Sequence, residues 1–101
     1  MDPVIPDIRI SDLVVSTAGR DRGQWFYVIK EEPQYLYLAN GKDRTLDKPK
    51  RKKRKHIQKV LRSETRVAEK LRTGDKVLNG ELRRDLASLS RDMQSDDLGG
   101  F

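Results

Sequence analysis

The segment Trp25-Phe26-Tyr27-Val28-Ile29 carries the strongest strand signal in this chain of 101 residues. Its aromatic and β-branched residues favour an extended backbone, in which successive side chains point to opposite faces of a sheet. Trp25, Tyr27 and Ile29 therefore share one face, and Phe26 and Val28 share the other. One face must fill the interior of a small β-structure. The other needs cover from the C-terminal half of the chain, or it remains an exposed aromatic surface.

Weaker strand signals lie on both sides of this segment. Residues 13–15 end before a glycine-flanked loop, Gly19–Gly23, and residues 35–39 follow the central segment. Asn40-Gly41 predicts a tight hairpin turn of type I′. From that turn we expect a short fourth strand, residues 44–46, to return along the third. Turns spaced about 8–12 residues apart are typical of a small barrel or sandwich.

The C-terminal half has helical periodicity instead. In residues 63–72 apolar side chains recur at three and four positions, and Gly74 is placed for the reversal that ends a helix. Residues 56–58 allow two interpretations, either an earlier start of this helix at His56 or a fifth strand that closes the barrel. A second helix is predicted from Asn79, which can cap its N-terminus. Its apolar stripe consists of Leu82, Leu86, Leu89 and Met93.

These patterns divide the chain into four parts. They are a lead-in segment at 1–12, a barrel at 13–62, a helical appendage at 63–93 and a tail at 94–101. Two prolines disfavour regular structure in the lead-in segment. The tail, QSDDLGGF, has no periodicity and is predicted to be disordered. The predicted fold class is therefore mainly β with an α-helical C-terminal part.

Positive charge is concentrated in one stretch, Lys48–Lys55, which we call the cationic segment. Its sequence KPKRKKRK holds seven cations and no acid, whereas the net charge of the whole chain is +6. The other residues therefore sum to −1. Such focused charge indicates a polyanionic partner, and phosphate contacts would make binding strongly dependent on salt. The alternative is a solvated, disordered tract that only keeps the protein soluble.

The composition excludes several kinds of site. No cysteine is present, which removes disulfides, thiolate metal sites and thiol nucleophiles. The carboxylate pairs Glu31-Glu32 and Asp96-Asp97 have no neighbouring histidine or glycine-rich loop, so we expect no enzyme, no metal and no cofactor. Neither a signal peptide nor an apolar run of about 18 residues is visible. We expect a cytoplasmic protein that is monomeric when free and does not contact membranes.

From Leu13 onward the chain resembles a KOW motif, a run of alternating apolar and polar residues with a glycine at its eleventh position. Counted from Leu13, that glycine is Gly23. Residues 15–23 are similar to bacterial relatives of an archaeal and eukaryotic large-subunit ribosomal protein. Further agreeing pieces are the turn at 40–42, Leu46, Lys55-His56 and residues 77–84. Gln24 and Trp25 depart from the pattern, because a basic residue and a tyrosine are more usual there.

The resemblance implies an SH3-like (KOW) β-barrel of about five short strands, followed by one or two helices, that binds RNA in or near the ribosome. The expected partner is ribosomal RNA or another structured RNA in translation, with ribosomal or transcription proteins beside it. The alternative is a protein–protein interaction module similar to the KOW domains of transcription elongation factors. It would use the aromatic strand face or the leucine stripe. Double-stranded DNA is a third candidate partner.

Two regions supply the candidate RNA contacts. The first is the cationic segment with its flanks, and the second is the loop Gly19–Gly23, which we call the arginine loop. Its glycines allow close approach to a phosphate and its arginines present forks suited to one, although a plain turn, with Asp21 pinning an arginine, is the alternative. The candidate set is Gly19, Arg20, Arg22, Gly23, Lys42, Arg44, Lys48, Lys50, Arg51, Lys52, Lys53, Arg54, Lys55 and His56.

The aromatic side chains between Trp25 and Tyr37 have two possible roles. They can stack on unpaired bases or fill the core. Core packing is the favoured interpretation, since a chain with 35% hydrophobic residues needs its large apolar groups for the interior. His56, the only histidine, can contact a base or phosphate, or it can pack at the end of a strand.

Overall fold

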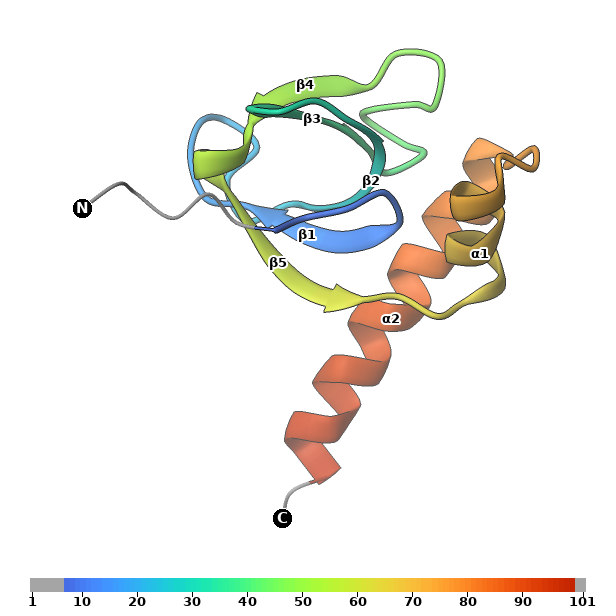
Figure 1. The fold of residues 1–101 in the computed structure, drawn as a ribbon. Helices are drawn as coiled ribbons and strands as arrows, with labels where there is room; N and C mark the ends of the chain where they lie inside the picture. The colour runs from blue at the N-terminus through green and yellow to red at the C-terminus, as the bar shows by residue number, and fades with distance from the viewer. Residues whose placement is uncertain (1–6, 100–101) are drawn as a thin grey trace.

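The computed structural model describes residues 7–99, with side chains described for residues 7–93. Five antiparallel strands are followed by two helices (Figure 1), as the sequence predicts for a mainly β chain with a helical C-terminal part. The strands are β1 (Asp12–Ser16), β2 (Trp25–Glu31), β3 (Tyr35–Ala39), β4 (Lys50–Lys53) and β5 (Ile57–Arg62). The two helices are α1 (Arg66–Thr73) and α2 (Asn79–Gly99), and a short 3₁₀ turn, η1 (Arg54–His56), lies between β4 and β5.

The strands lie in the order β4-β3-β2-β1-β5, so the two edge strands are consecutive in the chain and are joined by η1. The sheet therefore has to curve, and Figure 1 shows its strands curling around a common interior. Two backbone hydrogen bonds anchor η1 to the neighbouring loops. The amide of Thr17 donates to the carbonyl of His56, and the amide of Arg54 donates to the carbonyl of Gln34.

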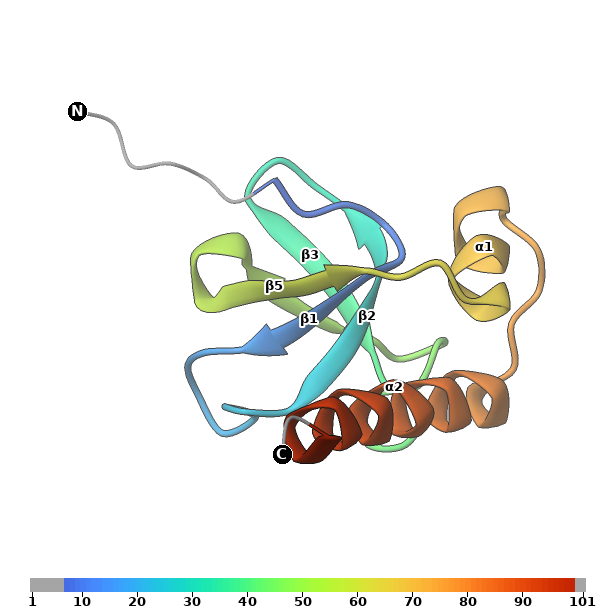
Figure 2. The same cartoon turned by 90° about the horizontal axis from the view of Figure 1, so that it is seen from below.

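The strand β2 is buried on both faces. Phe26 and Val28 point into the curve of the sheet and belong to an inner cluster with Ile8, Val14, Leu36, Leu38 and Ile57. Tyr27 points the other way and belongs to an outer cluster with Leu13, Ala39, Val67, Ala68, Leu82 and Leu86. The predicted cover from the C-terminal half is therefore present, and Figure 2 shows α2 passing close to the start of β2.

The connection between β3 and β4 differs from the prediction. The fourth strand is Lys50–Lys53, inside the cationic segment, whereas residues 44–46 contribute only an isolated bridge between Thr45 and Lys48. A type I′ turn needs positive φ at both central residues. Gly41 has φ +78°, but among the described non-glycine residues only Ser11 has a positive φ. The tight hairpin prediction at Asn40-Gly41 is therefore wrong, and residues 40–49 form a longer connection.

The boundaries of the C-terminal elements also sharpen the predictions. Ile57 and Gln58 begin the strand β5, whereas His56 ends η1, so a fifth strand is present from Ile57 onward and the start of the α-helix at His56 is wrong. β5 lies at one edge of the sheet. α1 begins at Arg66, later than predicted, because the side chain of Thr65 caps it by accepting the amide of Ala68. It ends at Thr73, and Gly74 follows in the left-handed conformation of the predicted reversal.

The start of α2 is capped differently from the prediction. Glu81 accepts the backbone amide of Leu78 at 3.1 Å, in the manner of a capping box. Asn79 lies inside the helix, and its side-chain oxygen accepts the amide of Leu46 at 2.8 Å instead of capping. The prediction of disorder from residue 94 is wrong for the backbone up to Gly99, which stays helical. A helix extends easily once it exists, because each added residue gains one hydrogen bond. Residues 100–101 lie outside the described part.

The predicted lead-in segment contributes to the core. Ile8 is fully buried in the inner cluster, and Asp12 already belongs to β1. The guanidinium of Arg54 donates to the carbonyl of Ile8 at 2.8 Å, which ties this segment to η1. Residues 1–6 lie outside the described part.

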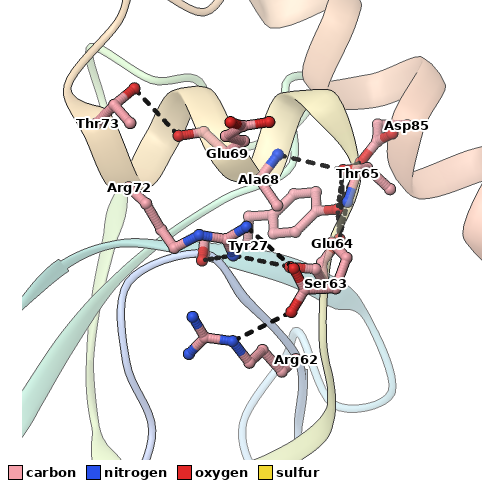
Figure 3. Close-up of polar contacts among 11 residues, drawn as sticks. Tyr27, Arg62, Ser63, Glu64, Thr65, Ala68, Glu69, Arg72, Thr73 and Asp85 are labelled. Atoms are coloured by element: carbon pink, nitrogen blue, oxygen red, sulfur yellow. Dashed lines mark hydrogen bonds and ion pairs between the residues drawn. The ribbon is translucent and has the colours of Figure 1, made fainter.

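A buried polar network joins β2 to both helices (Figure 3). The hydroxyl of Tyr27 donates to Asp85 of α2 at 2.5 Å and lies 2.7 Å from the hydroxyl of Ser63. Thr65 donates to the same carboxylate at 2.8 Å. Burial and the hydrogen bond to Asp85 raise the pKa of Tyr27 to about 12. The network therefore fixes where α2 lies on the sheet.

Replacing Tyr27 by phenylalanine should destabilise the protein by about 1–3 kcal/mol, because Asp85 and Ser63 lose a buried partner. Urea unfolding followed by circular dichroism measures the free energy of unfolding. The matched control is Tyr35→Phe, since no described residue hydrogen bonds to the Tyr35 hydroxyl. Equal stability of the two variants would contradict the structural role of the network.

The same network predicts a loss of stability at alkaline pH. The folded protein holds the Tyr27 proton up to a pKa of about 12, whereas an unfolded tyrosine has a pKa of about 10. This contribution is therefore complete below pH ~10 and is lost as the pH rises towards the folded value. The difference in unfolding free energy between wild type and Tyr27→Phe should shrink over that interval. A constant difference would show that the hydroxyl does not titrate with folding.

Candidate nucleic-acid interface

The register of β4 divides the cationic segment into inward and outward side chains. Lys50 lies opposite Leu38 and Lys52 lies opposite Leu36 in the β3–β4 ladder. Directly opposed residues point to the same face of a sheet, and both leucines belong to the inner cluster. Lys50 and Lys52 therefore point towards the concave side, where they are partly buried.

Lys52 holds the arginine loop against β4. Its ammonium group lies 2.6 Å from the carboxylate of Asp21 and 2.6 Å from the carbonyl of Ala18, and its side chain is only 9% exposed. Burial alone would raise the pKa of Asp21, but hydrogen bonds from Lys52 and Ser16 outweigh it and lower the pKa. Asp21 thus pins Lys52, whereas the sequence suggested an arginine of its own loop.

Arg54 is also used within the fold. It is buried, and its guanidinium donates to the carbonyls of Glu32 at 3.1 Å and Ile8 at 2.8 Å. A carboxylate oxygen of Glu31 lies 3.7 Å from the same group. Two members of the candidate set, Lys52 and Arg54, therefore have their charges satisfied by the protein itself.

The outward side chains of β4 form a surface with two tyrosines of β3. Arg51 lies opposite Tyr37 and Lys53 lies opposite Tyr35. The guanidinium of Arg51 stacks 3.6 Å from the centre of the Tyr35 ring, and the ammonium of Lys30 lies 5.0 Å from the centre of the Tyr37 ring. We call these five residues the tyrosine face. It combines partly exposed aromatic rings with cations, which suits stacking and phosphate contacts together.

One acid organises this face. Glu32 accepts a hydrogen bond from Arg51 at 2.9 Å and another from the Tyr37 hydroxyl at 3.2 Å. The hydrogen bond from Arg51 is the main reason that the pKa of Glu32 lies below its ordinary value. Glu31 accepts the amide of Ile10 at 3.1 Å. The Glu31-Glu32 pair therefore positions cations and backbone.

The remaining candidate residues are largely exposed. Within the described part of the chain, Lys48, Lys53 and Lys55 are exposed and form no ion pair. The exposed members of the two loops are Gly19, Arg20, Arg22, Gly23, Lys42 and Arg44. His56 is partly buried at the end of η1. The contact between Lys52 and Asp21 brings the arginine loop beside β4, as a shared surface requires.

Sequence reasoning missed the contribution of α2. Arg83, together with Trp25 of β2 and Lys42 of the β3–β4 connection, lines a groove of about 460 Å³. Arg83 belongs to the stretch 77–84 that carries the resemblance, but nothing marked it as a binding residue, because one more arginine on the polar face of a predicted helix is ordinary. Only the packing of α2 beside the start of β2 brings these three side chains to one place.

The protein-interaction hypothesis relied on two apolar surfaces, the aromatic strand face and the leucine stripe, and both are largely buried within the protein. On the aromatic strand face, Tyr27 is fully buried and Trp25 is partly buried. On the leucine stripe, Leu82 and Leu86 are buried in the same cluster. These two surfaces pack against each other, so neither is available as a large apolar docking site.

The described residues contain no group of three or more histidine, cysteine, aspartate or glutamate side chains that could hold a metal ion. Over the same residues, no helix has the length and apolar character needed to cross a membrane. A scan against models of protein families found no match to this chain. A search of curated proteins found no significant match either.

Two neighbouring lysines of β4 should differ in their contribution to stability. Lys52→Gln leaves the Asp21 carboxylate buried without its cation and should cost about 1–3 kcal/mol of stability. Lys53→Gln, on the opposite face of the strand, should change stability by less than about 0.5 kcal/mol. Urea unfolding at neutral pH measures the free energy of unfolding of both variants.

The pH dependence provides a further check on this ion pair. The lowered pKa of Asp21 stabilises the fold above the ordinary carboxylate pKa, and this contribution is lost as the pH falls through the folded value. The difference in unfolding free energy between wild type and Lys52→Gln should therefore become smaller in acid. Lys52→Gln and Lys53→Gln being equally stable would contradict the assignment.

Proposed function

We propose that this protein binds structured RNA, with ribosomal RNA as the leading candidate, through a small KOW-type, SH3-like barrel. One observation carries the proposal. The cationic segment is an ordered edge strand and turn whose outward cations adjoin two tyrosine rings, while Lys52 and Arg54 are used inside the fold. A purely solubilising tract needs neither the order nor the aromatic neighbours.

The arrangement of the strands supports the barrel. An antiparallel sheet whose edge strands are joined by a short 3₁₀ turn is curved by its own connectivity, as a small barrel requires. Gly23, the eleventh residue from Leu13, has φ +87°, a conformation that side chains other than glycine rarely adopt. That conformation supplies a physical reason for the glycine of the KOW pattern.

The chemistry of the exposed residues favours phosphate contacts over base readout. Lysine is a flexible point charge, and the exposed cations Lys48, Lys53 and Lys55 lie just before β4, at its end and in η1. Such a row matches the repeating phosphates of a nucleic acid backbone. Recognition of this kind reads charge and shape, and the tyrosine face adds stacking on unpaired bases.

RNA binding should fall steeply with salt, and removing two exposed cations should reduce that dependence. In Lys53→Gln/Lys55→Gln the slope of log affinity against log salt should decrease by about 0.7–0.9 for each lost phosphate contact. Filter binding of a folded ribosomal RNA fragment across potassium chloride concentrations measures the slope. Folding of both proteins is checked by circular dichroism.

The matched control removes two exposed cations from the helical part, in Arg66→Gln/Lys76→Gln. It should bind RNA like wild type, because the two cations that it removes lie away from the proposed surface. Both variants have the same net charge, so a difference between them reports the place of the lost cations. Affinity independent of salt, or equal loss in the two variants, would count against the proposed surface. Competition with duplex DNA tests the choice of RNA, and co-sedimentation with ribosomal particles tests the ribosomal partner.

A further inference from the structure

We infer that the groove beside α2 is a binding site for one unpaired nucleotide, separate from the tyrosine face. This inference rests on the proposed RNA binding and extends it to a second site. The groove has a volume of about 460 Å³, within the roughly 300–1,000 Å³ of small-ligand sites. Its walls come from the start of β2, the β3–β4 connection and the middle of α2.

The lining of the groove matches the parts of a nucleotide. Trp25 offers an aromatic ring for a base, and Leu86 adds an apolar surface beside it. Ser90 contributes a hydroxyl that can hydrogen bond to a base edge or a sugar. Stacking on tryptophan tolerates every base, because each base has a π-face. The site therefore selects for an accessible base and not for a particular sequence.

Two cations select for an anion at this groove. Lys42 and Arg83 approach it from different elements, both are exposed, and neither forms an ion pair with a described acid. No carboxylate belongs to the described lining residues. An uncharged or cationic ligand would not neutralise these two positive charges, whereas a phosphate can contact both. Charge and ring together point to a nucleotide.

A site of this kind would accept a base from single-stranded RNA but not from a duplex. Bases within a duplex are stacked on their neighbours and cannot enter a pocket. An unpaired nucleotide, in a loop, a bulge or an end, has a free base face. The groove should therefore prefer RNA with unpaired residues, while the cationic segment contacts phosphates of either form.

Trp25 is the only tryptophan in the chain, so its intrinsic fluorescence reports on the groove directly. Titration with a short single-stranded oligoadenylate should quench this fluorescence, and a blunt RNA duplex of equal length should not. In Lys42→Gln and in Arg83→Gln the affinity for the single strand should fall, and the salt slope should drop by about 0.7 in each. Trp25→Leu should weaken binding of a labelled single strand about tenfold.

Lys76→Gln is the matched control, because Lys76 is an exposed cation in the connection between the helices and does not line the groove. It should behave like wild type in every measurement. Should Trp25→Leu fail to fold, the two charge variants still decide the question, since both residues are exposed.

The outcomes separate this inference from the proposed function. RNA binding with unchanged Trp25 fluorescence, and with Lys42→Gln and Arg83→Gln equal to Lys76→Gln, overturns the groove and leaves the RNA-binding surface of β4 standing. Absence of RNA binding by filter assay at low salt overturns both. Quenching by the duplex as strong as by the single strand also overturns the groove as a site for an unpaired base.

Discussion

The two-sided burial of β2 is the constraint on which the rest of this fold depends. A chain with 35% hydrophobic residues has little apolar material, and five of its large side chains are consecutive in one strand. Both faces of that strand must therefore be covered. The curved sheet encloses Phe26 and Val28, and the helices cover Tyr27. Because tyrosine carries a hydroxyl into that second core, a polar partner had to come with the helices, and Asp85 supplies it.

The cationic segment has a structural role in addition to its proposed contacts. β4 is an edge strand, and edge strands with lysines resist pairing with other chains. Its inward residue Lys52 reaches the arginine loop, and the buried Arg54 ties the lead-in segment to η1. The cations of β4 and η1 therefore hold neighbouring segments together and protect the edge of the sheet, and in our proposal they also bind RNA. Only the cations that point outward from β4, and those at the two ends of the cationic segment, are available for RNA binding.

Hydrophobic pattern explains which elements could be predicted. β2, β3 and both helices carry clear periodicity, and the structure places them close to their predicted positions. β4 could not be found in this way, because KRKK has no alternation of polarity although its side chains alternate between faces. Lys52 and Lys53 differ only in their surroundings, because Lys52 pairs with Asp21 whereas Lys53 is exposed to solvent. For the same reason, sequence alone could not divide the cations of the candidate set between fold and surface.

The groove beside α2 exists because of a contact that sequence cannot show. A side chain at Gly41 would place its first carbon 2.2 Å from the carbonyl oxygen of Asn79, so the β3–β4 connection lies directly on the first turn of α2. The Asn79 side chain holds the same connection through the amide of Leu46. Lys42 follows Gly41, and Arg83 lies one turn after Asn79, so this contact sets both cations at the same groove. The glycine that looked like part of a tight hairpin instead makes room for the helix that completes the groove.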